Sequence, residues 1–140
     1  MLSRAIASED QLPPIEHLQR VPEFHVENLL RQGVFTTGLL LEVSETPTRR
    51  QYLADQIGAT TSDVSAWRDE ALLLNLANFG PDEQLLFTQG RLVGISDVLA
   101  LPLDEFRHRL HRAARALDRE PPDDLMVEGW WEQAQTLHEE

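Results

Sequence analysis

The chain has 140 residues, 41% of them hydrophobic, which is enough for one ordinary domain with its own packed core. It contains no cysteine, so disulfides, thiolate metal sites, iron–sulfur clusters and cysteine nucleophiles are excluded. The formal net charge is -12 and every basic residue is an arginine, so a nucleic acid would have to bind against the field of the protein.

The beginning of the chain predicts neither a secretory signal nor a membrane anchor. The first apolar run is broken by Ser8, Glu9 and Asp10, and no stretch approaches the roughly 20 apolar residues of a membrane span. We therefore expect a cytoplasmic protein without a membrane span.

Two diprolines divide the chain, because proline lacks an N–H group and restricts the residue before it. They lie at Pro13–Pro14 and at Pro121–Pro122. They predict an N-terminal extension over residues 1–14, a central domain over 15–120 and an acidic C-terminal tail over 121–140.

Apolar residues of the central domain recur at steps of three and four, which predicts helices and an all-α fold. Thr46–Pro47 is typical of a helix start, and Gly58 is typical of a helix end. Thr60, with Asp63 three residues later, resembles a capping box. These signals predict helices over about 47–57 and 61–76.

A weak internal repeat relates residues 18–37 to residues 76–95. Each copy has a helix, a tight hairpin, a helix with Leu29 or Phe87 facing inward, a turn and a short apolar helix. Each copy resembles a helix-hairpin-helix unit, whose hairpin carries two glycines. The second copy keeps one of them in Asn78-Phe79-Gly80-Pro81, whereas Arg20-Val21-Pro22 in the first copy keeps neither.

The segment between the copies makes the resemblance more specific. It comprises residues 45–58 and continues to Val64 and Trp67. With the two hairpins it resembles a bacterial family of unknown function, common in cyanobacteria, that has tandem helix-hairpin-helix units joined by such a helical linker. The resemblance covers about residues 15–117. It implies a tandem helix-hairpin-helix domain with a helix-turn-helix-like linker and a short helical tail, and it implies no settled activity.

A hairpin and the linker are the first two elements that could bind nucleic acid. A hairpin grips a phosphate with backbone N–H groups at a helix start, here around Asn78 and Gly80, although the acidic residues that follow would repel the phosphate. The linker is similar to a helix-turn-helix with Thr61–Arg68 as recognition helix, in which Arg68 is the one basic residue.

The helix expected near residues 102–119 carries a basic face on an acidic protein. Its members fall within an arc of about 140° at 100° per residue, opposite an apolar stripe. They are Arg107, His108, His111, Arg112, Arg115 and Arg119. Such a face could hold an acidic partner or a nucleic-acid backbone, and Arg112 is a candidate residue in either case. It could also be a solvated face or an internal partner for the acidic tail.

Glu105 joins His108 and His111 at a spacing that could face one divalent cation, but the neighbouring arginines would repel it. We expect no metal site and no cofactor.

The acidic tail carries Trp130, Trp131 and Leu137 at helical spacing. Adjacent tryptophans are typical of an anchor for a partner's groove, but the tail could equally cover an apolar strip of its own domain. Insertion into a second copy of the chain would give a homo-oligomer.

The sequence shows no glycine-rich phosphate loop, no nucleophile elbow and no paired carboxylates in an apolar frame, so we do not expect an enzyme. The leading hypothesis is a protein–protein interaction adaptor or assembly factor that uses the basic face and the tail. The alternative is a DNA- or RNA-binding protein that uses the hairpin, the linker helix or the basic face.

Overall fold

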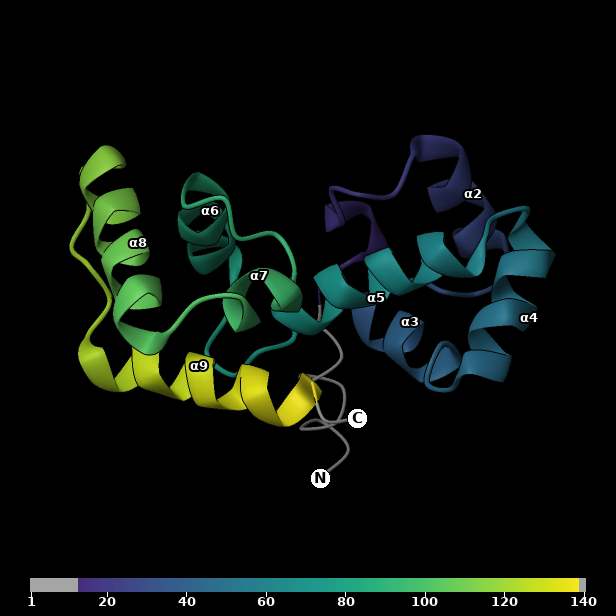
Figure 1. The fold of residues 1–140 in the computed structure, drawn as a ribbon. Coiled ribbons are helices and arrows are strands. Elements are labelled where there is room, and N and C mark those ends of the chain that lie inside the picture. Colours follow the sequence, from purple (N-terminus) through teal and green to yellow (C-terminus); the bar gives the residue numbers. More distant parts are fainter. Residues whose placement is uncertain (1–12, 139–140) are drawn as a thin grey trace, which may run out of the picture. The chain divides into compact units, whose positions relative to one another are not determined.

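A computed structural model describes residues 13–138, and this range contains helices and no strand, which confirms the all-α prediction. The chain divides into two compact units, with the boundary between Ala71 and Leu72 inside a helix. Unit 1 contains η1 (Ile15–His17), α2 (Glu23–Arg31), α3 (Thr37–Val43), α4 (Pro47–Ile57) and most of α5 (Thr61–Leu74). Unit 2 contains α6 (Pro81–Gln89), α7 (Ile95–Leu99), α8 (Leu103–Ala116) and α9 (Asp124–His138) (Figure 1). Residues 1–12 of the predicted N-terminal extension lie outside the described residues.

The helix boundaries of unit 1 follow the predicted signals. The Thr46 hydroxyl accepts a hydrogen bond from the Arg49 N–H at the start of α4, and Gly58 ends that helix with a φ of 74°. Thr60 and Asp63 exchange backbone-to-side-chain hydrogen bonds at 3.0 and 3.1 Å, as the capping box predicts. The helix predicted over 61–76 ends at residue 74, two residues early.

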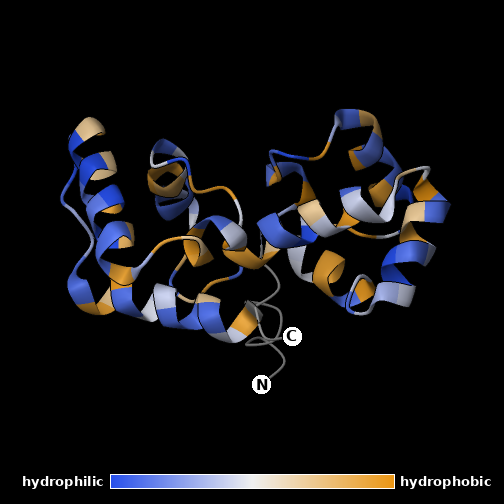
Figure 2. Cartoon of the chain, in the orientation of Figure 1, coloured by the Kyte–Doolittle hydropathy of each residue, from blue (hydrophilic) through white to orange (hydrophobic). Residues whose placement is uncertain are grey.

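The core of unit 1 lies where α4 packs against α2 and α3 and where Trp67 of α5 lies 5.1 Å from the ring of His25. In unit 2, α8 packs against α6, and α9 packs against both α7 and α8. Its core contains three buried aromatic side chains, Phe87, Phe106 and Trp130, among aliphatic ones. Figure 2 shows α8 as a largely hydrophilic ribbon, because only one of its faces enters this core.

The hydrogen bonds at the two predicted copies match position by position. The Val34 N–H donates to the Leu29 carbonyl at 2.9 Å, and the Leu92 N–H donates to the Phe87 carbonyl at 2.8 Å. The turn that follows α2 has Gly33 at a φ of 84°, and the matching turn after α6 has Arg91 at 63°. The two segments therefore share one backbone geometry.

The structure extends this repeat to α4 and α8. The Ala59 N–H donates to the Ala54 carbonyl at 2.9 Å, and the Arg119 N–H donates to the Ala114 carbonyl at the same distance. Between these pairs, Gly58 and Asp118 occupy the same left-handed position.

The last helices of the two units also correspond. The buried residues Val64, Trp67 and Ala71 of α5 have the spacing of Val127, Trp130 and Ala134 of α9, which are also buried. The caps match as well, because the Asp63 N–H donates to the Thr60 hydroxyl and the Met126 N–H donates to the Asp123 carboxylate. The segment predicted as a tail is thus the fourth helix of the second repeat, and α5 is the fourth helix of the first.

Asp118 and Gly58 both have a left-handed backbone, with φ values of 58° and 74°. Substitutions at the two positions can therefore test the cost of a side chain in this conformation. A side chain raises the energy of this conformation, whereas glycine adopts it freely. We expect Asp118→Gly to raise the free energy of unfolding by about 0.5–1 kcal/mol and Gly58→Ala to lower it by about 1 kcal/mol. Urea denaturation of both variants measures the two changes, and a loss of stability in Asp118→Gly contradicts the expectation.

Candidate functional site

Two arginines of the predicted basic face are paired within unit 2. Arg107 lies 3.0 Å from Asp104 in its own helix and 3.2 Å from Asp124 at the start of α9. Glu128 in the next turn of α9 lies 3.9 Å from Arg107. At the other end of α8, Arg119 lies 3.7 Å from the carboxylate of Asp82 and donates to its carbonyl at 3.2 Å. These two arginines therefore hold helices of unit 2 together.

The remaining members of the basic face have no ionic partner in the described part of the chain. His108, Arg112 and Arg115 are exposed, and His111 is half-buried with its Nε2 atom unsatisfied. The unpaired members of the basic face thus lie between the two paired arginines in the chain.

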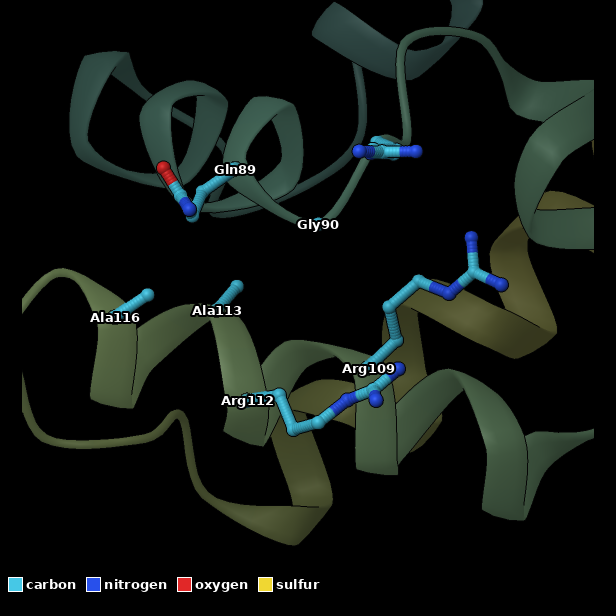
Figure 3. Close-up of a pocket in the computed structure, with 7 residues that line it drawn as sticks. Gln89, Gly90, Arg109, Arg112, Ala113 and Ala116 are labelled. Carbon is cyan, nitrogen blue, oxygen red and sulfur yellow. The ribbon is translucent and has the colours of Figure 1, made fainter.

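A hollow of about 410 Å³ lies between the C-terminal end of α6 and α8. Three of its lining side chains are arginines, Arg91, Arg109 and Arg112, and within residues 13–138 none of them forms an ion pair. Figure 3 shows Gln89 of α6 facing the α8 residues Ala113 and Ala116, with Arg109 and Arg112 projecting from α8. Both of these α8 residues are alanines, whose short side chains line the hollow.

The hollow concentrates positive charge on a protein whose net charge is -12. Guanidinium groups pair bidentately with planar carboxylates and with phosphates. No acidic side chain lines the hollow among the described residues, so its arginines are available to an external anion. We call this hollow the arginine pocket.

Sequence reasoning found Arg112 of this pocket and missed Arg91 and Arg109. Arg109 could have been included, because at 100° per residue it lies only 60° from Arg112 on the helix. Arg91 is 18 residues before Arg109 in the chain and reaches the pocket from the turn after α6. The internal repeat was the signal that could have placed that turn beside α8.

Two of the groups of the nucleic-acid alternative already form hydrogen bonds within their own units. The Gly80 N–H donates to the Glu83 carboxylate at 2.8 Å, so the chain's own acid occupies the amide that would grip a phosphate. Arg68 donates to the Leu41 carbonyl at 2.9 Å inside unit 1. Asn78 is exposed, at a positive φ of 59°.

The tail residues lie against their own unit. Trp130 is buried, and its indole N–H donates to the Ala77 carbonyl at 2.9 Å. Trp131 is half-buried and donates to the Leu101 carbonyl at 3.0 Å, and Leu137 packs against the same core. Of the three arrangements that the sequence left open, the structure has docking in cis.

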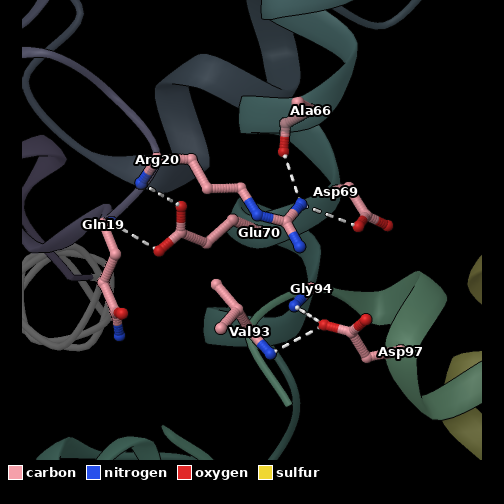
Figure 4. Close-up of polar contacts among 8 residues, drawn as sticks. All are labelled: Gln19, Arg20, Ala66, Asp69, Glu70, Val93, Gly94 and Asp97. Carbon is pink, nitrogen blue, oxygen red and sulfur yellow. Dashed lines mark hydrogen bonds and ion pairs between the residues drawn. The ribbon is translucent and has the colours of Figure 1, made fainter. Parts of the chain in front are cut away.

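Unit 1 contains a buried carboxylate, Glu70, with 1% of its surface exposed. It accepts hydrogen bonds from the backbone N–H groups of Gln19 and Arg20 (Figure 4). Burial raises the pKa of Glu70 above its ordinary value of 4.5, and the two N–H groups and the Arg20 cation oppose this rise. In unit 2, Gln133 takes the equivalent place and accepts from the Ala77 N–H at 3.0 Å. Glu70 therefore fixes a turn of the fold.

Among the described residues, no group of three histidine or acidic side chains is arranged to hold a metal ion. Within residues 13–138, no helix combines the length and the apolar surface that crossing a membrane requires.

Comparison with known proteins gives a family and nothing more specific. No curated protein and no solved structure matches the chain. One family model does match it, over residues 19–137, and its description is "Domain of unknown function (DUF4332)". The matched range begins one residue into the first copy of the repeat and ends in α9. The chain belongs to this family of domains of unknown function.

Proposed function

We propose that the protein is a non-enzymatic interaction adaptor of the cytoplasm, whose unit 2 binds an acidic segment of a partner protein at the arginine pocket. The observation that carries the proposal is the cluster of Arg91, Arg109 and Arg112, which no acidic side chain of the described chain neutralises. Neighbouring guanidinium groups repel one another, and a ligand with several carboxylates relieves that repulsion.

A polypeptide fits this surface better than a nucleic acid for two reasons. A duplex presents phosphates over a long distance and would meet the negative field of the rest of the protein. The hairpin amides are also taken, since Gly80 donates to Glu83, and Gly94 donates to Asp97 at 3.0 Å. We propose that the two repeats are helix-hairpin-helix units in which the chain's own carboxylates have replaced the phosphate.

Reversing charge in the pocket should abolish binding of an acidic peptide. We expect the double variant Arg109→Glu/Arg112→Glu to bind a fluorescein-labelled oligoglutamate peptide at least about 30-fold more weakly than the wild type, because two charge-assisted pairs become repulsive. Both side chains reach solvent, so the fold should be retained. Fluorescence anisotropy measures the affinity, and circular dichroism checks the helix content.

Arg107→Glu is not a suitable control, because Arg107 ties α8 to α9. Arg115→Glu is suitable, since it changes the same charge on the same helix outside the pocket lining. We expect that control variant to bind the peptide no more than about threefold more weakly than the wild type does. If Arg115→Glu and Arg109→Glu/Arg112→Glu lose peptide affinity equally, the peptide responds to the overall positive charge of α8 and not to a defined site. Binding of a labelled DNA duplex that is tighter than peptide binding at moderate salt would favour the nucleic-acid alternative.

A further inference from the structure

The arginine pocket has a counterpart in unit 1 at the equivalent place of the repeat. A hollow of about 240 Å³ lies between the end of α2 and α4. Position by position, five of its lining residues correspond to lining residues of the arginine pocket: Gln32 to Gly90, Arg49 to Arg109, Tyr52 to Arg112, Leu53 to Ala113 and Gln56 to Ala116. We call this hollow the tyrosine pocket.

The same place in the fold stays open although most of the side chains differ. Four of the five corresponding pairs change size or polarity, and the fifth keeps an arginine. The hollow therefore follows from the way the first and third helices of each repeat meet, and the lining decides which ligand fits. In unit 2 the lining of the hollow is cationic, and in unit 1 it is mainly apolar.

The lining of the tyrosine pocket is mainly apolar. Val34, Val43 and Leu53 form its walls, and the ring of Tyr52 stands beside them with 64% of its surface exposed. A tyrosine ring that is this exposed beside aliphatic walls offers a face on which another apolar side chain can stack. Burying such a side chain here removes apolar surface of both molecules from water.

One cation lies at the edge of this apolar surface. Arg49 lines the pocket, and its guanidinium donates to the Glu42 carbonyl at 3.0 Å, which leaves its charge without a carboxylate partner among the described residues. An apolar hollow with an arginine at its edge complements an apolar side chain that has an acidic neighbour.

We propose that the tyrosine pocket is a second binding site, which takes an aromatic or leucine side chain of a partner polypeptide with an aspartate or glutamate next to it. Tyr52 stacks on the apolar side chain, and Arg49 pairs with the carboxylate. This site is distinct from the arginine pocket and does not depend on it, because its ligand is held chiefly by apolar contact.

Selection from a library of short random peptides tests the proposal with the full-length chain. The bait is the Arg109→Glu/Arg112→Glu variant, in which the arginine pocket no longer competes for acidic peptides. We expect the selected peptides to share an aromatic residue or leucine beside an acid. When one of them is titrated into labelled protein, the backbone amide signals of Gln32, Tyr52 and Gln56 should shift and saturate.

Tyr52→Ala should lower the affinity for the selected peptide by about tenfold or more. Tyr52→Phe should keep the affinity within about twofold of the wild type, since the ring is kept. Arg49→Ala should weaken the peptide by about fivefold, and a serine in place of the peptide's apolar residue should abolish binding. Because Tyr52 is exposed, thermal unfolding of Tyr52→Ala should match that of the wild type.

Three outcomes would overturn the proposal: no common peptide motif, binding that is unchanged in Tyr52→Ala, or saturating shifts confined to unit 2. Binding of single-stranded oligonucleotides that depends on Tyr52 would assign the pocket to base stacking instead. If the anisotropy experiment shows no peptide binding at the arginine pocket, the test of the tyrosine pocket is unaffected. The two proposals are therefore tested separately.

Discussion

Trp130→Ala should destabilise unit 2 by about 3–5 kcal/mol, the usual cost of removing a large buried aromatic side chain. The indole is 2% exposed, and its ring lies 5.2 Å from that of Phe87 and 6.2 Å from that of Phe79 in edge-to-face geometry. Replacement also leaves the Ala77 carbonyl without its donor. Chemical denaturation should show a lower midpoint for the unfolding of unit 2.

The neighbouring tryptophan gives a matched control. Trp131 is only half-buried, although it too donates one hydrogen bond, to Leu101. We expect Trp131→Ala to cost about 1–2 kcal/mol, clearly less than Trp130→Ala. If Trp130→Ala leaves the unfolding midpoint within experimental error, α9 does not dock on unit 2, and the tail is free to anchor a partner.

This burial changes how the tail contributes to function. A variant at Trp130 that loses a partner protein could lose it through unfolding, so the residue cannot by itself report a contact surface. Exposed side chains such as Arg112 and Tyr52 can report one, because their replacement leaves the core in place.

The sequence allowed the helices with strong local signals to be predicted correctly. Threonine and proline at the start of α4 and glycine at its end act within a few residues of chain, so their meaning does not depend on distant contacts. The apolar spacing in α5 and α8 predicted their buried faces for the same reason. The matching turns after α2 and α6 could be aligned, because a tight turn limits which residues can occupy it.

The tail and the basic face were harder to interpret because both depend on contacts between distant segments. Val127, Trp130 and Ala134 repeat the pattern of Val64, Trp67 and Ala71, and that comparison could have identified α9 as a repeated core helix. The pairing of Arg107 with Asp124 could not be read from helical periodicity, since periodicity shows which face a residue occupies and not which helix packs there. The arginine pocket needed the same information.

Glu70 should make the stability of unit 1 depend on pH in an unusual direction. Burial raises the pKa of this carboxyl in the folded chain, so the folded state binds the proton more tightly than the unfolded state does. The contribution of Glu70 to the free energy of unfolding is therefore largest below the unfolded pKa of about 4.5, and it is lost as the pH rises through the folded pKa. A salt-bridged surface carboxylate, whose pKa is lowered on folding, would show the opposite trend.

The variant Glu70→Gln isolates the pH-dependent contribution of Glu70 to stability. Glutamine fits this place in the fold, because unit 2 has Gln133 at the equivalent position. Urea denaturation of the wild type and of Glu70→Gln should be compared from pH 7 down to about pH 5. We expect the wild type to gain stability relative to Glu70→Gln as the pH falls. Glu70→Ala should be less stable than both at every pH, by about 1–3 kcal/mol, because the part-buried hydrogen bonds from the N–H groups of Gln19 and Arg20 lose their acceptor. A difference between wild type and amide variant that does not change with pH would mean that the two N–H groups and Arg20 fully offset the effect of burial on the pKa of Glu70.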